Sequence, residues 1–237
     1  MCVLGYILGE DGRTLSFDLR QDELSAEWIG ALRVSLGGYQ ILLGASLAAV
    51  SHLGPSVDAL DAVILPTGHL RLLDGLVPLL AARTTDRPLT VVSLVGEPRS
   101  MALVDAFSRG WPHRAQPEVD VFVAGQPLAL GPTQLHTRPA RAGEPHGDAV
   151  SMVAGCGVRL TAAGQTVAFL PAVAPSRGWR AFIGQAELAV VEVGVRPWPA
   201  GQRPWRHDTA SAISAAQEAR RLWLVGDDGR PLDVAQA

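Results

Sequence analysis

The stretch from residue 60 to residue 80, "LDAVILPTGHLRLLDGLVPLL", decides the fold. Its first part belongs to an apolar run over 59–65, and a run so continuously apolar predicts a strand buried on both faces of a sheet. The part over 69–83 has apolar side chains nearly all round and predicts a helix. A turn between such elements often presents metal-binding histidines, yet this one offers a single histidine, His69. The chemistry that this turn can still support is therefore the central question.

The composition limits the classes of function. A chain of 237 residues with 48% hydrophobic residues can bury a sizeable core, and we expect one domain over 1–237. A net charge of -3 and a pI near 6.1 predict no nucleic-acid partner, because phosphate binding needs clustered basic residues. No apolar run reaches the length of a membrane span, and the start lacks the basic region of a signal peptide. Cys2 and Cys156 are too few for a disulfide framework, so we expect reduced thiols and a cytoplasmic protein.

The first half of the chain alternates strands and helices. Two β-rich runs at 3–8 and 13–19 are joined by Glu-Asp-Gly-Arg, which predicts a hairpin. The segment 22–36, "DELSAEWIGALRVSL", places large apolar residues at helical spacing after an acidic first turn and predicts an amphipathic helix. A strand is predicted at 88–95 and a helix over 97–110, where Gly110 suits a left-handed cap.

The second half begins with short strands. Over 118–170 these are separated by Gly or Pro turns and predict a meander. A strand at 186–194, a loop at 195–207, a helix over 208–220 and a strand at 221–225 follow. Two mixed sheets with helices outside each satisfy this order, so the predicted fold class is α/β (α+β), a four-layer αββα sandwich.

In this order the elements resemble the metallo-β-lactamase fold, over about 3–228. Members of that family carry Thr-His-x-His-x-Asp-His and then Gly-Leu, at a turn that follows a buried strand. Here "TGHLRLLDGL" occupies that place without a gap. The four ligand positions fall on Thr67, His69, Arg71 and Leu72, so the resemblance implies that one ligand of four remains.

Later landmarks of the family follow in sequence. The segment that brings a further histidine matches His146 better than His136, and Ala172 stands where the metal-bridging aspartate belongs. "WRHDTASAISAAQEARRLWLV" resembles the Gly-His-Met-Thr helix, and Val225 to Asp227 replace its closing Thr-His-Phe. "AFLPAVAP" and the Gly-Leu after the turn also resemble the branch of the pyrroloquinoline quinone biosynthesis B protein, whose metal motif is altered.

These substitutions change the chemistry that the turn allows. Zinc needs three or four converging protein ligands with lone pairs. Leu72 has no donor atom, Arg71 places a permanent positive charge beside the ion, and Ala172 cannot bridge two metals. Without the ion nothing lowers the pKa of water to near 7. The sequence therefore predicts no cofactor, and hydrolysis through a metal should fail.

Three functional hypotheses follow. The first is a protein without hydrolytic activity that binds a small molecule or a protein partner in a bacterial biosynthetic pathway. The second is an enzyme with a remodelled pocket, which uses His69, His146 and His207 on one weakly held zinc ion or as metal-free acid/base groups. The third is a structural subunit of a homodimer or of a complex with another protein.

The candidate site residues rest on this resemblance and on the loop 195–207, where Trp and Arg side chains gather as in binding hot spots. The alternatives are structural: a helix N-cap for His207 and Asp208, packing of the loop over the core, and a small buried residue for Cys156. The predicted catalytic residues are His69, His207 and Asp208, and the predicted ligand-binding residues are Thr67, Arg71, His146, Trp205 and Arg206.

Overall fold

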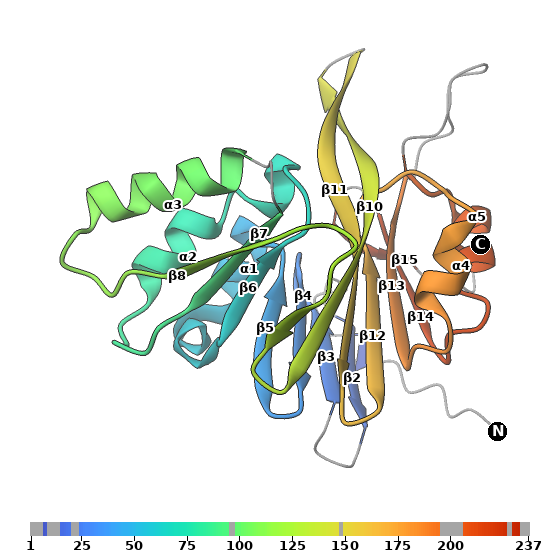
Figure 1. Ribbon diagram of the computed structural model, residues 1–237, viewed down its shortest axis with the longest axis horizontal. Coiled ribbons are helices and arrows are strands. Elements are labelled where there is room, and N and C mark those ends of the chain that lie inside the picture. Colours follow the sequence, from blue (N-terminus) through green and yellow to red (C-terminus); the bar gives the residue numbers. More distant parts are fainter. Residues whose placement is uncertain are drawn as a thin grey trace.

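The computed structural model describes residues 7–8, 15–19, 24–94, 98–146, 149–194, 206–226 and 229–232, with the backbone alone for 7–8, 15–19 and 142–152. Two sheets lie face to face, with α1 to α3 outside one and α4 and α5 outside the other (Figure 1). This is the four-layer order predicted from the sequence. The helices are α1 (Leu47–Leu53), α2 (Leu76–Ala82), α3 (Pro98–Gly110), α4 (Gly178–Ile183) and α5 (Thr209–Ala215), with 3-10 turns η1 (Gly54–Ala59) and η2 (Leu70–Leu72).

The first sheet has eight strands in chain order, antiparallel from β1 to β5 and parallel from β5 to β8. Within the parallel part, β6 and β7 are buried on both faces, as the apolar run at 59–65 predicted for β6, whereas β8 is largely exposed. The strands of the whole first sheet are β1 (Ile7–Leu8), β2 (Leu15–Leu19), β3 (Leu24–Trp28), β4 (Leu32–Leu36), β5 (Tyr39–Leu43), β6 (Ala62–Leu65), β7 (Thr90–Leu94) and β8 (Glu118–Phe122).

The second sheet has seven strands, which also follow one another in chain order from β9 at one edge to β15 at the other. The hairpin of β10 and β11 is long and extends beyond the body of the sandwich (Figure 1). The strands β12, β13 and β14 run parallel to one another. The members of this sheet are β9 (Leu128–Leu130), β10 (Thr133–His146), β11 (Ala149–Ala162), β12 (Gln165–Leu170), β13 (Leu188–Val193), β14 (Leu222–Gly226) and β15 (Pro231–Leu232).

Three apolar clusters fill the spaces between the layers. The largest lies between the two sheets, where the Trp28 and Phe169 ring centroids are 6.2 Å apart. The second lies under α1 to α3, and the third lies under α4 and α5 around Trp179. Residues along β13 alternate between the central and the outer cluster: Val190 belongs to the first and Val191 to the second. The side chain at 192 therefore faces the space between the sheets.

The helix predicted over 22–36 is wrong, because this segment forms the antiparallel hairpin of β3 and β4. Burial alternates along both strands, with Leu24, Trp28, Leu32 and Leu36 on the inner face. Apolar residues four apart satisfy a period of 2 as well as a period of 3.6, so their spacing did not distinguish the two structures. Gly30 marks the connection, since its φ of +89° favours glycine and interrupts a helix.

Other predicted elements are confirmed or corrected in detail. The hairpin at the start is confirmed by the pairing of β1 with β2, and the helix over 97–110 by α3. The helix predicted over 69–83 divides into η2 and α2, and that over 208–220 shortens to α5. The meander over 118–170 is wrong at its first strand: β8 joins the first sheet, parallel to β7, and the antiparallel strands begin at β9.

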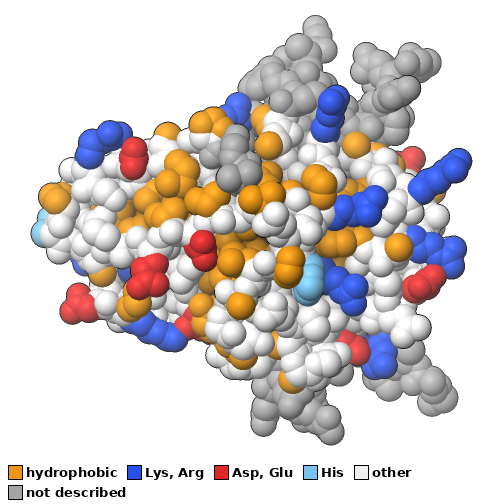
Figure 2. All heavy atoms as spheres, viewed as in Figure 1, with side chains coloured by type: hydrophobic (Ala, Val, Ile, Leu, Met, Phe, Trp, Pro, Cys, Tyr) orange, Lys and Arg blue, Asp and Glu red, His pale blue; other side chains and the backbone are white. Residues whose placement is uncertain are grey.

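Strand β8 forms the edge of the first sheet and carries exposed apolar side chains. Val119, Val121 and Val123 are between 40% and 45% exposed. Figure 2 shows hydrophobic side chains gathered across the half of the molecule that carries α3 and β8. None of the helices in the described ranges is long and apolar enough to cross a membrane.

The connection between β3 and β4 gives a test of the corrected hairpin. A Cβ atom at Gly30 would lie 2.8 Å from the Cβ of Ala48, whereas one at Gly38, with φ of +77°, would meet nothing within 4 Å. Gly38→Ala should therefore cost about 1 kcal/mol of unfolding free energy through backbone strain alone. Gly30→Ala should cost about 2 kcal/mol more, because α1 must also shift. Urea unfolding of both variants measures the difference, and equal losses would contradict the packing of α1 on this turn.

Candidate functional site

The turn after β6 is joined by its backbone to the second sheet. Thr67 forms an isolated bridge with Gly155 of β11, and the amide of Gly68 donates to the carbonyl of Ala154 at 3.2 Å. The amide of Cys156 donates to the carbonyl of Pro66 at 2.9 Å. These bonds fix the turn across the sandwich and determine where its side chains point.

The hydroxyl of Thr67 takes part in this connection between the turn and β11. It donates to the Ala154 carbonyl at 3.2 Å and accepts from the amide of His69 at 3.3 Å. Thr67 is fully buried. A hydroxyl that serves two backbone groups in the core is a structural group, and Thr67 here supports the turn.

His69 caps the short turn η2. Its Nδ1 accepts from the amide of Arg71 at 3.3 Å, and the residue is half-buried. A neutral imidazole has one lone pair for hydrogen bonding or for a metal, and Nδ1 uses that pair here. In the neutral tautomer that accepts this hydrogen bond the proton lies on the other nitrogen, Nε2, which then has no lone pair for a cation.

Leu72 points into the core. It is fully buried, and its Cδ2 lies 2.8 Å from the position that a Cβ atom of Gly44 would take. Its carbonyl accepts from the amide of Ala45 at 2.7 Å. The last ligand position of the family's motif is thus part of the packing between β5 and η2.

Arg71 makes an ion pair that sequence analysis did not predict. Its Nη2 donates to Oε1 of Glu192, a carboxylate on the inner face of β13. The side chain of Glu192 is 2% exposed and that of Arg71 is 23% exposed. The other oxygen, Oε2, is buried and accepts from no donor in the described residues. A single acidic residue in the apolar run "LAVVEV" was the signal that could have indicated this partner.

Ala172 and Cys156 are both buried. Ala172 has φ of +31°, in the region that favours glycine, and its methyl group supplies no ligand atom. The thiol of Cys156 donates to the carbonyl of Pro66 at 3.4 Å, and burial raises its pKa well above the usual range. A thiol that stays protonated and buried is no nucleophile, so Cys156 is a core residue.

His207 and Asp208 form the start of α5. His207 is fully buried, pairs with Val193 across a parallel bridge, and places Nδ1 3.2 Å from Oγ of Ser211. Burial lowers the pKa of His207 to about 4, so its ring is neutral at pH 7. Nε2 of His207 is buried without a hydrogen-bond partner among the described residues.

Asp208 and Ser211 satisfy each other's backbone. Oδ1 of Asp208 accepts from the amide of Ser211 at 2.7 Å, and Oγ of Ser211 accepts from the amide of Asp208 at 3.0 Å. The hydrogen bond from the Ser211 amide lowers the pKa of Asp208. This is a capping box, so the N-cap alternative for Asp208 is confirmed.

The remaining predicted residues are placed in part. Arg206 precedes His207 and is 4% exposed. The backbone of His146 ends β10, but its side chain lies outside the described residues, as does all of Trp205. The structure brings Thr67, His69 and Arg71 together on one turn. It joins that turn to β13 through Glu192, one residue before the partner of His207.

The described side chains do not fit a metal ion of the kind that the family's motif holds. Within the ranges that the structure describes, no group of three or more His, Cys, Asp or Glu residues could hold one. At the turn itself a hydroxyl supports the backbone, an imidazole lone pair caps η2, a guanidinium pairs with a carboxylate and a leucine packs in the core. No catalytic step through a metal is derived from this turn.

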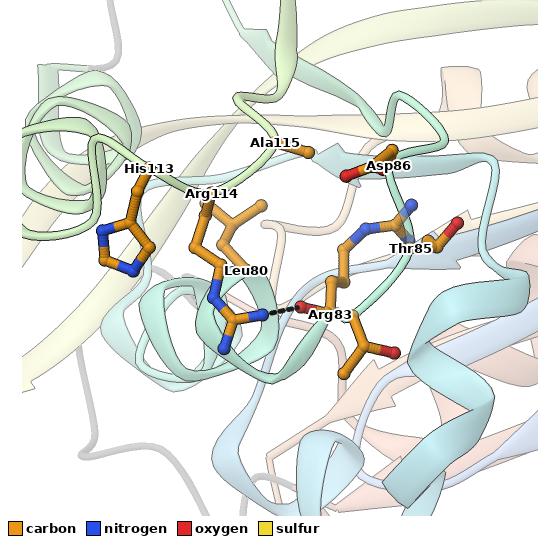
Figure 3. A pocket seen from close by; sticks show the side chains of 8 residues that line it. Leu80, Arg83, Thr85, Asp86, His113, Arg114 and Ala115 are labelled. Carbon is orange, nitrogen blue, oxygen red and sulfur yellow. Dashed lines mark hydrogen bonds between the residues drawn. The ribbon is translucent and has the colours of Figure 1, made fainter.

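A surface cleft of about 290 Å³ lies away from this turn. It is lined by Leu80, Arg83, Thr84, Thr85, Asp86, His113, Arg114 and Ala115 (Figure 3). Nη1 of Arg114 donates to the carbonyl of Arg83 at 3.2 Å, and the hydroxyl of Thr84 donates to Asp58.

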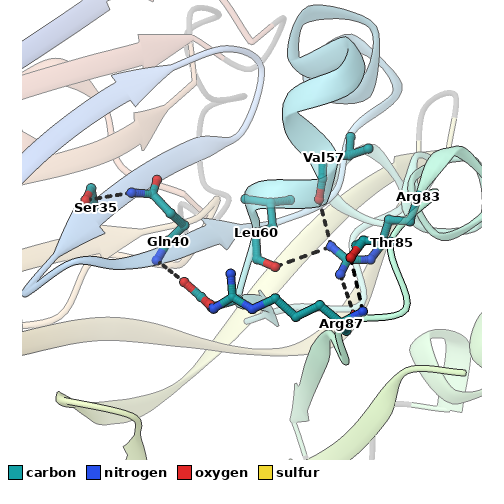
Figure 4. Close-up of polar contacts among 8 residues, drawn as sticks. Ser35, Gln40, Val57, Leu60, Arg83, Thr85 and Arg87 are labelled. Carbon is teal, nitrogen blue, oxygen red and sulfur yellow. Dashed lines mark hydrogen bonds and ion pairs between the residues drawn. The ribbon is translucent and has the colours of Figure 1, made fainter. Parts of the chain in front are cut away.

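The other polar groups beside this cleft also support the fold. The guanidinium of Arg83 donates to the carbonyls of Val57, Leu60 and Arg87, and Arg87 pairs with Asp61 (Figure 4). These bonds hold η1 to the segment before β7. The cleft is thus a by-product of a structural network.

Comparisons with known proteins identify the architecture. No protein-family model matches the chain, and neither does any curated protein sequence. Among solved structures it is similar to the metallo-β-lactamase fold protein YhfI from Bacillus subtilis, with TM-score 0.65 and 19% identity over 93% of this chain and 85% of that one.

Two further solved structures are similar. Zn²⁺-bound PqqB from Methylobacterium extorquens matches with TM-score 0.62 and 16% identity, over 81% of this chain and 76% of that one. Human tRNase Z, short form, matches with TM-score 0.61 and 12% identity, over 84% of this chain and 87% of that one. At these identities the likeness shows the fold, and the chain has the metallo-β-lactamase fold.

The buried ion pair predicts unequal costs for two arginine variants. Arg71→Ala leaves the Glu192 carboxylate buried without its partner and should lower the unfolding free energy by about 3 kcal/mol. The double variant Arg71→Gln with Glu192→Gln removes both charges and should recover most of that loss. Arg180→Ala breaks the exposed pair with Glu218 and should cost less than about 1 kcal/mol. Chemical denaturation measures all three, and a double variant no more stable than Arg71→Ala would contradict this account.

The burial of His207 predicts a pH dependence of stability. Its pKa in the folded protein, about 4, lies below the ordinary value of 6.5, so the folded state binds the proton less tightly than the unfolded state. Its contribution is therefore complete above pH 6.5 and is lost as the pH falls toward 4, by about 3 kcal/mol at most.

Unfolding free energies between pH 7 and pH 4 measure this dependence. The slope that His207 adds in this window should be absent in His207→Gln, and it should persist in His113→Gln, because His113 is exposed. Identical slopes in the wild type and His207→Gln would show that His207 is not buried as a neutral ring.

Proposed function

We propose, on the premise of the metallo-β-lactamase fold, that this protein binds a ligand at the turn after β6 and does not hydrolyse it through a metal. The observation that carries the proposal is the ion pair between Arg71 and Glu192, which puts a guanidinium in the aspartate position of the family's motif. Leu72 supports it, because its side chain is buried against Gly44. The side chains at two of the four ligand positions, Arg71 and Leu72, therefore make contacts within the fold and offer no ligand atom to a metal.

The biological setting remains part of the proposal. A small molecule or a protein partner in a bacterial biosynthetic pathway agrees with the sequence resemblance to the pyrroloquinoline quinone biosynthesis B branch. The structural likeness to PqqB is consistent with it but concerns the fold alone. A cytoplasmic location belongs to the same proposal.

The hypothesis of an acid/base enzyme is less well supported. His207 has a nitrogen without a described partner, but the side chain is fully buried and its other nitrogen, Nδ1, lies 3.2 Å from Oγ of Ser211. Asp208 is part of the capping box, and Nδ1 of His69 accepts from a backbone amide. A general acid or base must reach the proton that it transfers, whereas His69 and Asp208 bond to backbone amides and the ring of His207 is buried against Ser211.

Metal analysis tests the proposal directly. Protein produced with added zinc, iron or manganese and purified without a chelator should contain well below one metal ion per chain, because the turn presents too few ligand atoms. Elemental analysis by mass spectrometry gives the metal content, and His69→Ala should leave it unchanged. One or two ions per chain, removed by a chelator together with a hydrolytic activity on phosphodiester or β-lactam reporters, would refute the proposal.

A further inference from the structure

Three segments meet at Arg71. The turn after β6 carries it, β13 supplies Glu192 near its carboxyl end, and the segment after β14 supplies Gly229. A Cβ atom at Gly229 would lie 3.2 Å from Nη1 of Arg71, so the glycine leaves room beside the guanidinium. The carboxyl ends of parallel strands in the two sheets thus converge on one cation, and such ends are the usual place for ligands in α/β sheets.

Arg71 has donors beyond those that the fold uses. A guanidinium has five N–H groups, and one nitrogen, Nη2, serves Glu192. Neither Nε nor Nη1 has a hydrogen bond to any residue that the structure describes, and the side chain is 23% exposed. The ion pair also holds the planar group in one orientation, which reduces the entropy lost when a ligand binds.

Another basic side chain reaches the same turn. Nη1 of Arg99, from the first turn of α3, donates to the carbonyl of Gly68 at 2.8 Å and so brings a second guanidinium to the same turn. Glu192 is the acidic side chain that Arg71 contacts in the described residues.

The carboxylate of Glu192 places a second requirement on the ligand. Its Oε2 is buried beside the guanidinium and accepts from no donor in the described residues. An unsatisfied buried acceptor costs about 1 to 3 kcal/mol, and a ligand that donates to it recovers part of that cost. A ligand with an O–H or N–H group next to its anionic group meets both Arg71 and Glu192.

We infer that Arg71 and Glu192 together bind a small oxyanion, a carboxylate or a phosphate, that carries a neighbouring hydroxyl or ammonium donor. This inference rests on the proposed function and names the chemical class of its ligand. The guanidinium donates to the oxyanion through N–H groups that the ion pair leaves open, and Glu192 Oε2 accepts from the donor. Recognition by hydrogen bonds to a fixed guanidinium replaces coordination to a metal.

Binding of three simple probes tests the inference. Phosphate, propionate and lactate are titrated into the metal-free wild-type protein at constant ionic strength, with chloride as the background anion. Saturable shifts in a backbone NMR spectrum give the dissociation constants. Phosphate and the carboxylates distinguish the two oxyanion classes, and lactate against propionate isolates the hydroxyl, since the two acids otherwise share the carbon chain.

The variants make the result specific. Arg71→Gln with Glu192→Gln should weaken binding of the oxyanion by about tenfold or more, and Arg71→Lys should weaken it less, because it keeps the charge but loses the fork. Arg109→Gln, at the far end of α3 from Arg99, is the matched control and should bind as the wild type does. Tighter binding of lactate than of propionate, lost in the double variant, supports the donor to Glu192.

Several outcomes would overturn the inference. These are no saturable binding of any probe to the wild type, equal binding to the double variant, or a loss of the same size in Arg109→Gln. Equal affinities for lactate and propionate would overturn the role of Glu192. A metal-free protein that fails these titrations disproves the oxyanion ligand alone, whereas stoichiometric metal disproves the proposed function, so the two failures are distinguishable.

Discussion

The ion pair between Arg71 and Glu192 is the constraint on which the site depends. It joins the turn of the first sheet to β13 of the second, and the carboxylate is almost wholly removed from water. Removing one charge from such a pair leaves the other uncompensated in a medium that solvates it poorly. Neither residue can therefore change alone without a large loss of stability. The pair therefore fixes the position of the guanidinium against β13.

Each of the four positions that match the ligand motif makes a structural contact. The hydroxyl of Thr67 bonds to β11, Nδ1 of His69 caps η2, Arg71 pairs with β13, and Leu72 packs against Gly44. A bridging metal would tie the turn to the second sheet through its ligands, and here backbone bonds to Ala154 and Gly155 together with the ion pair tie it instead. The same architecture is thus held by different forces, which explains how the fold persists with so altered a motif.

The sequence predicted the architecture better than the details. Apolar runs buried on both faces identified β6, β7 and β13, because burial on two sides needs helices on both and leaves a continuous pattern. The hairpin of β3 and β4 was missed, because large side chains four apart fit either period and the turn at Gly30 was read as part of a helix. The sequence of β8 predicts a strand, but its local pattern does not indicate which of the two sheets the strand joins.

At the candidate site, too, the sequence did not predict a contact between residues that are far apart along the chain. The turn and its altered residues were visible in the sequence, but the partner of Arg71 lies 121 residues further along the chain. An acidic residue inside an apolar strand indicates that a counter-charge exists, and it does not indicate which one. The N-cap role of Asp208 was foreseeable from its place before a helix, because the chemistry of a cap is local.

The reactions that the site can support follow from the guanidinium of Arg71, which stands at a metal-ligand position of the family's motif. A zinc ion accepts electron pairs and so acidifies bound water, whereas a guanidinium has no vacant orbital and acts only through its N–H groups and its charge. It can therefore orient and neutralise an anion but cannot generate hydroxide near pH 7. His207 does not supply the missing base, since it is enclosed under α5 beside Ser211. Recognition of an anion, and not activation of water, is therefore the function that we propose for this set of side chains.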